Sequence, residues 1–330
     1  MTLPTFGFSS TADEVATVFA SEISGKNGAL RDAVLITGTS LNGIGFEAAR
    51  VLAQHANLVV ITGYNTERLA LSEAAIKLEN PRATVRPLVL DLASLASVRR
   101  AAAEVAAYPE PIHVLIHNAA SGGGPFTLTA DGHELQMATA LFGPFLLTKL
   151  LLPKFLSSAS AAPAWTPRVV FVASAAHTYG AGVDFAVLAA PRAETHTSVG
   201  AYYASKSAQI LFAAELARRA CGNIRAYSLH PGLVHTNIQE KSRADLQQLG
   251  VLNADGKPIT NTNLPWKTHA QGAATTITAA FDPRLHDQNG AYLDDCTIAT
   301  VSVAPHSSDP AIAKRLWDTT EQILGEPFTV

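Results

Sequence analysis

The chain has 330 residues, of which 48% are hydrophobic and 15% charged, and its formal net charge at pH 7 is −3. This composition is typical of a globular protein and excludes a disordered one, and the small negative charge argues against nucleic acid as the main partner. The only cysteines, Cys221 and Cys296, are far apart in sequence, which favours a reducing compartment and predicts two buried free thiols.

The start of the chain has no basic segment and no apolar run, so a signal peptide is not expected. The most apolar stretch, residues 145–156, is interrupted by Lys149, Pro153 and Lys154 and is shorter than the ~20 apolar residues of a membrane span. We therefore expect a cytoplasmic protein that does not associate with membranes.

Residues 1–30 predict a helical extension on the outside of the main domain. The pattern over residues 9–14, with Thr11 and Glu14, is typical of a capped helix start. The helix is expected to run to about Ser24, and residues 25–28 then predict a turn.

From residue 33 onward, short apolar runs alternate with amphipathic segments. Strands are predicted over residues 33–37, 58–62, 85–90, 112–116, 168–173 and 224–229. Helices are predicted over residues 44–54, 66–78, 94–107, 131–156 and 200–220, with a bend near residues 143–144 and a surface loop over residues 157–167. This alternation predicts an α/β fold: a doubly wound, Rossmann-type parallel sheet of about seven strands with helices on both faces, in one domain over residues 1–330.

In such sheets, ligands bind beyond the carboxyl ends of the strands. The first strand is followed by the glycine-rich run Thr37-Gly38-Thr39-Ser40-Leu41-Asn42-Gly43-Ile44-Gly45. A glycine-rich turn between a strand and a helix brings backbone N–H groups and the helix N-terminus against a pyrophosphate. Asp91, Asn118, Ser174 and the run His230-Pro231-Gly232 follow later strands in the same way.

Tyr202 and Lys206 are four residues apart on a predicted helix and therefore lie on one face of it. A free phenol has a pKa of roughly 10, and a neighbouring ammonium lowers it by favouring the phenolate. The pair is suited to giving and taking a proton, although the same spacing also occurs on solvated helix faces.

Together these segments resemble the short-chain dehydrogenase/reductase family, over roughly residues 33–296. The markers that carry the resemblance are the glycine turn, Asp91, the Asn118-Ala119-Ala120 motif, Ser174, the Tyr202/Lys206 pair and the Pro231-Gly232 turn. Residues 265–274 are similar to the retinol-dehydrogenase-like branch of that family. The N-terminal helix and residues 62–65 resemble a fungal group of the branch.

The resemblance implies a role for each marker. Tyr202 would protonate the substrate oxygen, Lys206 would hold the nicotinamide ribose and lower the pKa of Tyr202, and Ser174 would hydrogen-bond the substrate oxygen. Asp91 would contact the adenine, Asn118 would lie near the adenosine ribose and brace the fourth strand, and Thr236 would hold the nicotinamide amide. The predicted cofactor site comprises Gly38, Ser40, Asn42, Gly43, Ile44, Gly45, Tyr64, Asn65, Asp91, Leu92, Asn118, Ala119, Ala120, Tyr202, Lys206, Pro231, Gly232, Val234 and Thr236.

The sequence departs from the family pattern at three places. Four residues rather than three separate Gly38 from Gly43, which predicts a larger bulge in the turn, and Ala120 stands where glycine is usual. Ala140 stands where the family commonly has an asparagine that helps hold a water relay to the lysine. The departure at Ala140 predicts a rearranged or slower proton path, or lost activity.

Three functions are therefore open. The leading one is an oxidoreductase that interconverts a ketone or aldehyde and an alcohol. The second is a catalytically weak or inactive cofactor-binding regulator or scaffold. The third is a non-redox cyclase or dehydratase on the same fold, against which the intact set of Ser174, Tyr202 and Lys206 argues.

NADP is the favoured cofactor, and NAD is the alternative. NAD-preferring members usually carry an acidic residue after the second strand, where this chain has Gly63 followed by Tyr64 and Asn65. The arginine that often binds the NADP phosphate is missing as well. Hydrogen bonds to that phosphate are expected from Ser40, Asn42, Tyr64 and Asn65, with Arg68 nearby.

Residues 177–199 and 233–269 are expected to cover the substrate. The apolar side chains that either line a pocket for a medium-sized carbonyl or alcohol, or simply pack within loops, are Phe185, Leu188, Leu233, Ile238 and Trp266. His235 either contacts substrate or is an ordinary loop histidine. His113 and His117 lie on a strand rather than a helix, so they do not match a helical metal pair and no metal site is expected.

A homodimer through the long helix and the tyrosine-bearing helix is the expected assembly. Apolar surface for it would come from Leu146, Leu147 and residues 150–152, which a buried core explains equally well.

Overall fold

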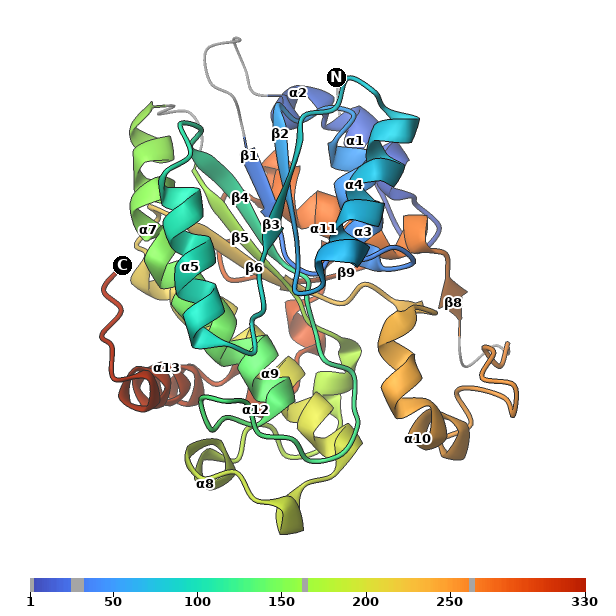
Figure 1. Cartoon of the computed structure of the whole chain (residues 1–330), viewed down its shortest axis with the longest axis vertical. Coiled ribbons are helices and arrows are strands. Elements are labelled where there is room, and N and C mark those ends of the chain that lie inside the picture. Colours follow the sequence, from blue (N-terminus) through green and yellow to red (C-terminus); the bar gives the residue numbers. More distant parts are fainter. Residues whose placement is uncertain (1–2, 25–32, 162–165, 261–264) are drawn as a thin grey trace.

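The computed structural model describes residues 3–24, 33–161, 166–260 and 265–330. An eight-stranded sheet runs through its centre in the order β10-β9-β6-β5-β4-β1-β2-β3 (Figure 1). Its strands are β1 Ala33–Ile36, β2 Leu58–Gly63, β3 Val85–Val89, β4 Ile112–His117, β5 Arg168–Val172, β6 Arg225–Leu229, β9 Tyr292–Asp294 and β10 Thr297–Ile298. Neighbouring strands pair in parallel except β10, which is antiparallel to β9, so the doubly wound parallel fold is confirmed.

The helices and short elements alternate with these strands. The α-helices are α1 Ala12–Val18, α2 Ala20–Ile23, α3 Ile44–Leu52, α4 Thr66–Glu79, α5 Leu95–Ala106, α6 Leu135–Met137, α7 Gly143–Ala161, α8 Phe185–Ala189, α9 Ser198–Arg219, α10 Arg243–Gln248, α11 His269–Phe281, α12 Pro305–Ser308 and α13 Pro310–Leu324. The 3₁₀ turns are η2 Ala175–Thr178, η3 Ala193–Thr195, η4 Asn237–Ser242, η5 Pro283–Leu285 and η6 Thr300–Ser302, and a two-stranded sheet joins β7 Leu233–Val234 to β8 Trp266–Lys267.

Both faces of the large sheet are buried. Ala33 and Leu35 of β1 belong to the core on one side, whereas Val34 and Ile36 belong to the core on the other. Because successive strand residues point to opposite faces, a strand covered on both sides is a continuous apolar run in the sequence. Helices α5, α7, α9 and α13 contribute to the first core, and α1, α3, α4 and α11 to the second (Figure 1).

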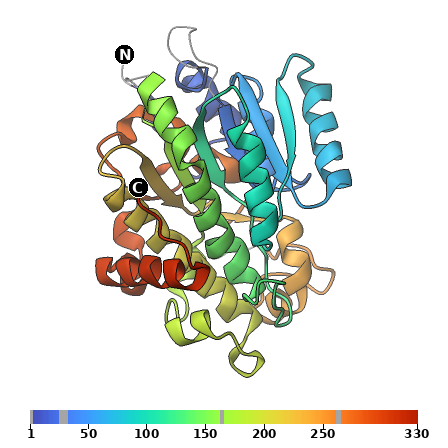
Figure 2. The same cartoon turned by 60° about the vertical axis from the view of Figure 1, so that its left-hand side comes forward.

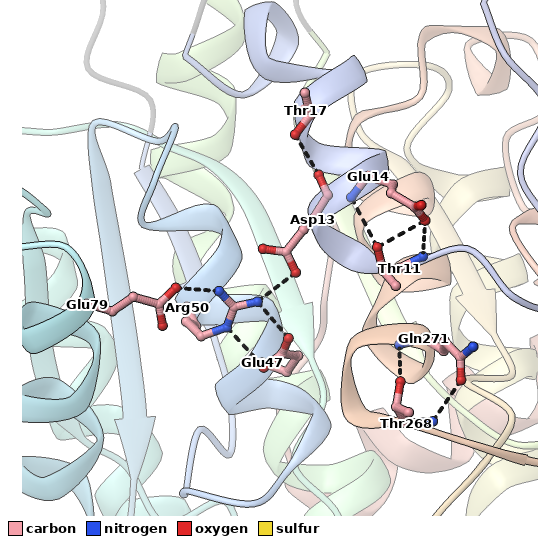
Figure 3. A network of polar contacts seen from close by, with 9 residues as sticks. All are labelled: Thr11, Asp13, Glu14, Thr17, Glu47, Arg50, Glu79, Thr268 and Gln271. Atoms are coloured by element: carbon pink, nitrogen blue, oxygen red, sulfur yellow. Dashed lines mark hydrogen bonds and ion pairs between the residues drawn. The ribbon is translucent and has the colours of Figure 1, made fainter.

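The N-terminal extension packs on α3 and α11. Thr11 and Glu14 form the predicted capping box at the start of α1, but the expected single helix is divided at Phe19 into α1 and α2. Arg50 of α3 binds Asp13 of α1 at 2.7 Å and also the carboxylates of Glu47 and Glu79 (Figure 3). The turn predicted over residues 25–28 lies outside the described residues.

The long apolar helix begins at Leu135, later than expected, and its hydrogen bonding changes before Gly143. Residues Ala138–Phe142 form a π-helical turn, in which the N–H of Gly143 donates to the carbonyl of Ala138. Pro144 has no N–H to donate to the carbonyl of Ala140, so a regular α-helical bond is missing at this point. The bend predicted near residues 143–144 therefore takes the form of a π turn just before them.

The loop predicted over residues 157–167 is wrong for its first part, because α7 continues to Ala161. Alanine is the best helix former and serine is tolerated, so a run of small residues does not by itself end a helix. Residues 162–165 lie outside the described residues.

The run Leu135–Ser157 has 23 residues and a mean hydropathy of 1.5, so by length and composition alone it could cross a membrane. This corrects the expectation that the apolar stretch is too short. However, 72% of its most apolar window is buried inside the protein, as in a core helix. Leu146, Leu147 and Leu151 are fully buried, so these leucines are part of the core rather than of a free surface.

Helix α13 and the C-terminal tail cover part of the face formed by α7 and α9. Trp317 stacks on Phe328 with ring centroids 4.8 Å apart, and both contact Phe145 of α7 at 4.9 and 5.2 Å. Phe212 of α9 lies 5.6 Å from Trp317. Figure 2 shows α13 (red) lying crosswise beside α7 (green). The face expected to receive a second copy is thus partly occupied by the chain itself.

Cys296 is buried, but Cys221 is exposed, and both are free thiols. The prediction of two buried cysteines is therefore wrong for Cys221. That residue lies two positions after the end of α9 and has a φ of +46°, which places it in a tight turn at the surface.

Candidate active site

The turn between β1 and α3 is held by contacts that leave room only for glycine. Gly38 has a φ of +72°, and a Cβ at this position would lie 2.7 Å from the Cα of Ala119. A Cβ on Gly45 would lie 2.2 Å from the side-chain nitrogen of Asn118. Asn42, in the lengthened part of the turn, has a φ of +61°, a left-handed conformation that asparagine tolerates better than most residues.

Asn118 ties the end of β4 to this turn. Its side-chain amide donates to the carbonyls of Thr37 and Gly38 at 3.0 and 2.9 Å. The hydroxyl of Thr37 accepts in return from the backbone N–H groups of Asn118 and Ala119, both at 3.0 Å. The strand order reverses between β1 and β4, which is the point where α/β sheets bind ligands. Thr37, which the motif analysis did not single out, is thus the partner of Asn118.

The start of α3 fits the pyrophosphate of a dinucleotide. Its N-cap residue is Gly43, which offers no side-chain hydrogen bond to the first turn of the helix. Ile44 and Ser40 beside it are half-buried, and Gly45 is buried. A helix start without a side-chain cap, preceded by close-packed glycines, presents backbone N–H groups and the positive end of the helix dipole to an anion.

The residues expected at the adenosine end lie after β2 and β3. Tyr64 is exposed, and Asn65 caps α4 by accepting from the backbone N–H of Arg68 at 2.9 Å. Asp91 is half-buried and accepts from the backbone N–H two residues further on at 2.9 Å, and Leu92 beside it is buried. These side chains frame the end of the sheet without placing a carboxylate at residues 63–65.

Ser174 lies two residues after the end of β5 and caps the short η2 turn. Its hydroxyl accepts from the backbone N–H of Ala176 at 3.1 Å, and its carbonyl lies 2.7 Å from Nδ1 of His177. The Nε2 of His177 accepts from the backbone N–H of Ala304 at 3.3 Å, so Nδ1 carries the proton and donates to Ser174. Burial lowers the pKa of His177, which keeps this neutral tautomer. His177 was not predicted; its only signal is a histidine three residues after the serine.

Tyr202 lies in the first part of α9, and the side chain of Ser174 is close enough to its hydroxyl to act on the pKa of the phenol. Burial raises the pKa of Tyr202, and the side chain of Ser174 partly offsets this. The expectation that Lys206 lowers this pKa is therefore not met here. The physical reason is the burial of the phenol itself, and burial also lowers the pKa of Lys206, to about 7.

Lys206 lies beneath the tyrosine, with Nζ 5.4 Å from the centroid of the Tyr202 ring. The amine is buried and donates to the carbonyl of Val172 and to Oε1 of Gln209, both at 2.9 Å. Val172 is the last residue of β5, two positions before Ser174, so the contact joins α9 to the end of that strand. Gln209 was also absent from the predicted site, and its only signal is its position one helical turn after the lysine.

The run that follows β6 is shaped by a second close contact. Pro231 is buried, and Gly232 has a φ of +87°, where a Cβ would lie 2.5 Å from Cδ of Lys267. Val234 pairs with Lys267 in the small sheet of β7 and β8. The hydroxyl of Thr236 caps η4 by accepting from the backbone N–H two residues further on at 3.4 Å.

The segment 233–269 touches the glycine turn and the loop after β4. The side-chain nitrogen of Asn237 donates to the carbonyl of Leu41 at 2.8 Å. A Cβ on Gly122 would lie 2.4 Å from Cγ1 of Ile238, so the two backbones are in close contact. The lengthened glycine turn is therefore held in part by the segment 233–269, which we call the lid.

The five predicted pocket residues divide into two groups. Leu188 is buried in the main core and the ring of Phe185 packs against Arg315 of α13, so both belong to packing rather than to a pocket. Leu233, Ile238 and Trp266 are half-buried within the lid segment. For these three lid residues, a role in lining the substrate pocket stays a prediction.

The predicted ordinary histidines lie in the core or within the lid. His117 is buried, stacks on Phe171 and lies 2.9 Å from the hydroxyl of Thr148, and burial lowers its pKa to about 3. His113 is buried, and His235 is exposed, with Nε2 3.3 Å from the carbonyl of Gly256. Over residues 3–24, 33–161, 166–260 and 265–330, no group of three or more His, Cys, Asp or Glu side chains is arranged to hold a metal ion.

Comparison with known proteins gives a consistent result. The profile of the short chain dehydrogenase family matches residues 32–247. The chain is 36% identical to the short-chain dehydrogenase TIC 32 A, chloroplastic, of Brassica napus, over 97% of this chain and 94% of that protein. It is 34% identical to human retinol dehydrogenase 11, over 89% of this chain and 86% of the relative.

Among solved structures, a short chain dehydrogenase from Escherichia coli complexed with NADPH is 24% identical, with a TM-score of 0.60. The match covers 82% of this chain and 99% of the bacterial one, and it shows a common fold. With the profile match, the relatives and the geometry of the site in agreement, the chain belongs to the short-chain dehydrogenase family.

Proposed function

We propose that the protein is an NADP(H)-dependent oxidoreductase that interconverts a ketone or aldehyde and the corresponding alcohol. The proposal rests on one observation: Tyr202 lies beside the buried amine of Lys206, and that amine donates to the carbonyl of Val172, two residues before Ser174. Ser174 follows the carboxyl end of β5, and Tyr202 and Lys206 lie on α9. The glycine turn follows the carboxyl end of β1 in the same sheet.

Each of the three residues has a distinct part in the reaction. Bound NADPH supplies a hydride to the carbonyl carbon. Tyr202 donates its hydroxyl proton to the carbonyl oxygen, so that C=O becomes CH–OH, and it takes the proton back in the reverse direction. Ser174 donates a hydrogen bond to the same oxygen and stabilises its developing negative charge. Lys206 holds the nicotinamide ribose, and its positive charge favours the tyrosinate left after proton transfer.

NADP is preferred over NAD because the end of β2 carries no carboxylate that would repel a 2′-phosphate. Tyr64 is exposed there, and Arg68 lies in the first turn of α4, where its charge can reach an anion. The bacterial structure of the same fold was solved with NADPH, which supports this choice. The ratio of KM values for NADPH and NADH tests it, and a strong preference for NADH would contradict it.

The substrate class that we propose is a medium-sized apolar carbonyl compound or alcohol. Leu233, Ile238 and Trp266 give the lid an apolar surface. Retinol dehydrogenases among the relatives are named for an apolar alcohol. A panel of aldehydes and ketones of increasing chain length, assayed with NADPH, tests this class.

Three further properties are proposed on narrower grounds. The N-terminal helix and residues 62–65 support membership of a fungal group, and the presence of only two cysteines in 330 residues supports a cytoplasmic location. A homodimer would have to use the part of α7 that α13 leaves open, where Leu150 and Leu152 are half-buried. Light scattering of the purified protein tests the assembly.

The catalytic proposal is tested with Tyr202→Phe. We expect turnover of every carbonyl substrate to fall by about 100- to 10,000-fold, the usual contribution of a general acid, while NADPH affinity changes little. Tyr203→Phe is the matched control, because the neighbouring ring packs on Tyr179 and should retain activity. Full activity of Tyr202→Phe would refute the assignment.

A catalytically weak, cofactor-binding regulator or scaffold is the second candidate, and Ala140 favours it. This residue is buried in the π turn and presents only a methyl group where relatives commonly have an amide. Saturable NADPH binding in a fluorescence titration, together with no turnover across the carbonyl panel, would favour this candidate over the enzyme.

A further inference from the structure

Gln209 is a fully buried amide on the same helix as the catalytic pair. Its Oε1 accepts from Nζ of Lys206 at 2.9 Å, and its exposed fraction is 0%. Its Nε2 is buried and has no hydrogen-bond partner in the part of the chain that the structure describes. A buried amide with one unpaired end is costly and uncommon in native proteins, so its presence calls for a role beyond packing.

Within the part of the chain that the structure describes, Gln209 provides the one side-chain hydrogen bond to the amine of Lys206. An ammonium group has three N–H donors, and its other hydrogen-bond acceptor here is the carbonyl of Val172, which belongs to the backbone. A substitution can therefore remove the Gln209 contact without altering β5. Ala140, on the neighbouring π turn, has no amide to offer. The amide of Gln209 is the side-chain group that accepts a hydrogen bond from the amine of Lys206.

We propose that Gln209 is a positioning residue, which holds the amine of Lys206 beneath Tyr202 and stabilises its protonated form. The proposal deepens the proposed function and rests on it for the catalytic meaning of Lys206. The chemistry is direct, because a carbonyl oxygen accepts from an ammonium and thereby favours the charged state over the neutral amine.

The other ionisable groups of this set do not change their protonation near neutral pH, as Lys206 does. His230 follows β6, and burial together with the charge of Lys267 lowers its pKa to about 4, so it is neutral at pH 7. Burial lowers the pKa of His177 and raises that of Tyr202. Lys206 is therefore the group of this set whose protonation changes near neutral pH.

The test uses the full-length protein labelled with ε-¹³C-lysine, in which the NMR titration of Lys206 is followed and assigned by its loss in Lys206→Met. In Gln209→Met, which keeps the size of the side chain but removes the acceptor, we expect the pKa of Lys206 to fall by about one to two units. In Gln209→Glu, the added negative charge should raise it by at least about one unit. Ser207→Ala is the control, since it removes a neighbouring buried hydrogen bond, to Ser307, without touching the amine.

The pH profile of kcat/KM for carbonyl reduction gives a second readout. Its alkaline limb should move to lower pH in Gln209→Met and to higher pH in Gln209→Glu, and should stay in place in Ser207→Ala. A loss of folding alone would lower activity without moving the limb in two directions. An unchanged pKa of Lys206 in both Gln209 variants would overturn the inference. If the wild-type protein reduces no carbonyl, the proposed function fails, whereas the NMR titration still decides whether Gln209 controls Lys206.

Discussion

At the carboxyl end of β1 the candidate site is made of backbone, whereas at α9 it is made of side chains. After β1, Gly38 and Gly45 allow close backbone contacts because they have no Cβ. The uncapped start of α3 offers backbone N–H groups, which any sequence of suitable shape would supply. Tyr202 and Lys206 instead depend on their own functional groups and on burial, which shifts both pKa values. From this difference we expect the two parts to be impaired by different changes. A change of backbone shape should impair the glycine turn, and a change of protonation should impair Tyr202 and Lys206.

Among the variants that test this comparison, Gly45→Ala should have the largest effect. The new Cβ would lie 2.2 Å from Nδ2 of Asn118 and 2.5 Å from the carbonyl of Gly38, so the turn must open. We expect NADPH affinity to fall by about 100-fold or more, which corresponds to about 3 kcal/mol. Isothermal titration measures the loss. Gly63→Ala is the control, since its Cβ would meet only Leu69 at an ordinary 3.9 Å; an equal loss in both variants would contradict the argument from shape.

Lys206→Met should change how stability depends on pH. The pKa of Lys206 is about 7 in the folded protein against 10.5 for the ordinary amine, so between these values the unfolded chain binds the extra proton. Wild-type stability should therefore rise with pH across this window, by about 2–3 kcal/mol from pH 7 to 9 relative to the Met variant. Urea unfolding at both pH values measures the difference. Lys314→Met, at an exposed ion pair, should retain the wild-type slope, and a parallel slope in Lys206→Met would refute the buried-amine account.

His177→Phe separates the two parts of the site most cleanly. It keeps a ring of similar shape but removes the Nδ1 donor to the carbonyl of Ser174. We expect kcat to fall by about 10-fold, the lower range for a misplaced catalytic group, with NADPH affinity unchanged. Steady-state kinetics and a binding titration measure the two quantities. A loss of NADPH affinity with kcat intact would show that the two parts are not independent.

Thr11→Ala should have the smallest effect, confined to the N-terminal extension. Loss of an N-cap hydroxyl typically costs about 1 kcal/mol, and the capping box of α1 depends on this side chain. The free energy of unfolding should fall by that amount, with kcat and NADPH affinity preserved. Ser9→Ala, two residues earlier and outside the cap, should leave stability as in the wild type.

Sequence alone predicted what depends on local pattern. The strands from β1 to β6 are apolar runs because both faces of the sheet are covered, and the glycine turn is recognisable because it joins a strand to a helix. The capping box at Thr11 was predictable for the same reason, since its two partners are three residues apart. The positions of the predicted site residues follow from these elements, although their roles remain predictions.

What depends on contacts between distant segments could not be predicted. The direction of the pKa change at Tyr202 follows from burial, which only the folded chain determines. Phe185 and Leu188 are apolar loop residues in the sequence. In the structure, Phe185 packs against α13 and Leu188 is buried in the main core. The continuation of α7 to Ala161 was hidden by a composition that suits loops and helices alike.

One late segment touches two residues that lie beside the catalytic ones. The backbone N–H of Ala304 donates to His177, and the hydroxyl of Ser307 lies 2.5 Å from that of Ser207, directly after Lys206. During synthesis, every recognisable family motif up to residue 296 leaves the ribosome before this segment does. A chain stopped near residue 300 would carry a complete set of signature residues and still lack the brace that orients its serine, so a gene truncated there would pass a motif search while encoding an impaired enzyme.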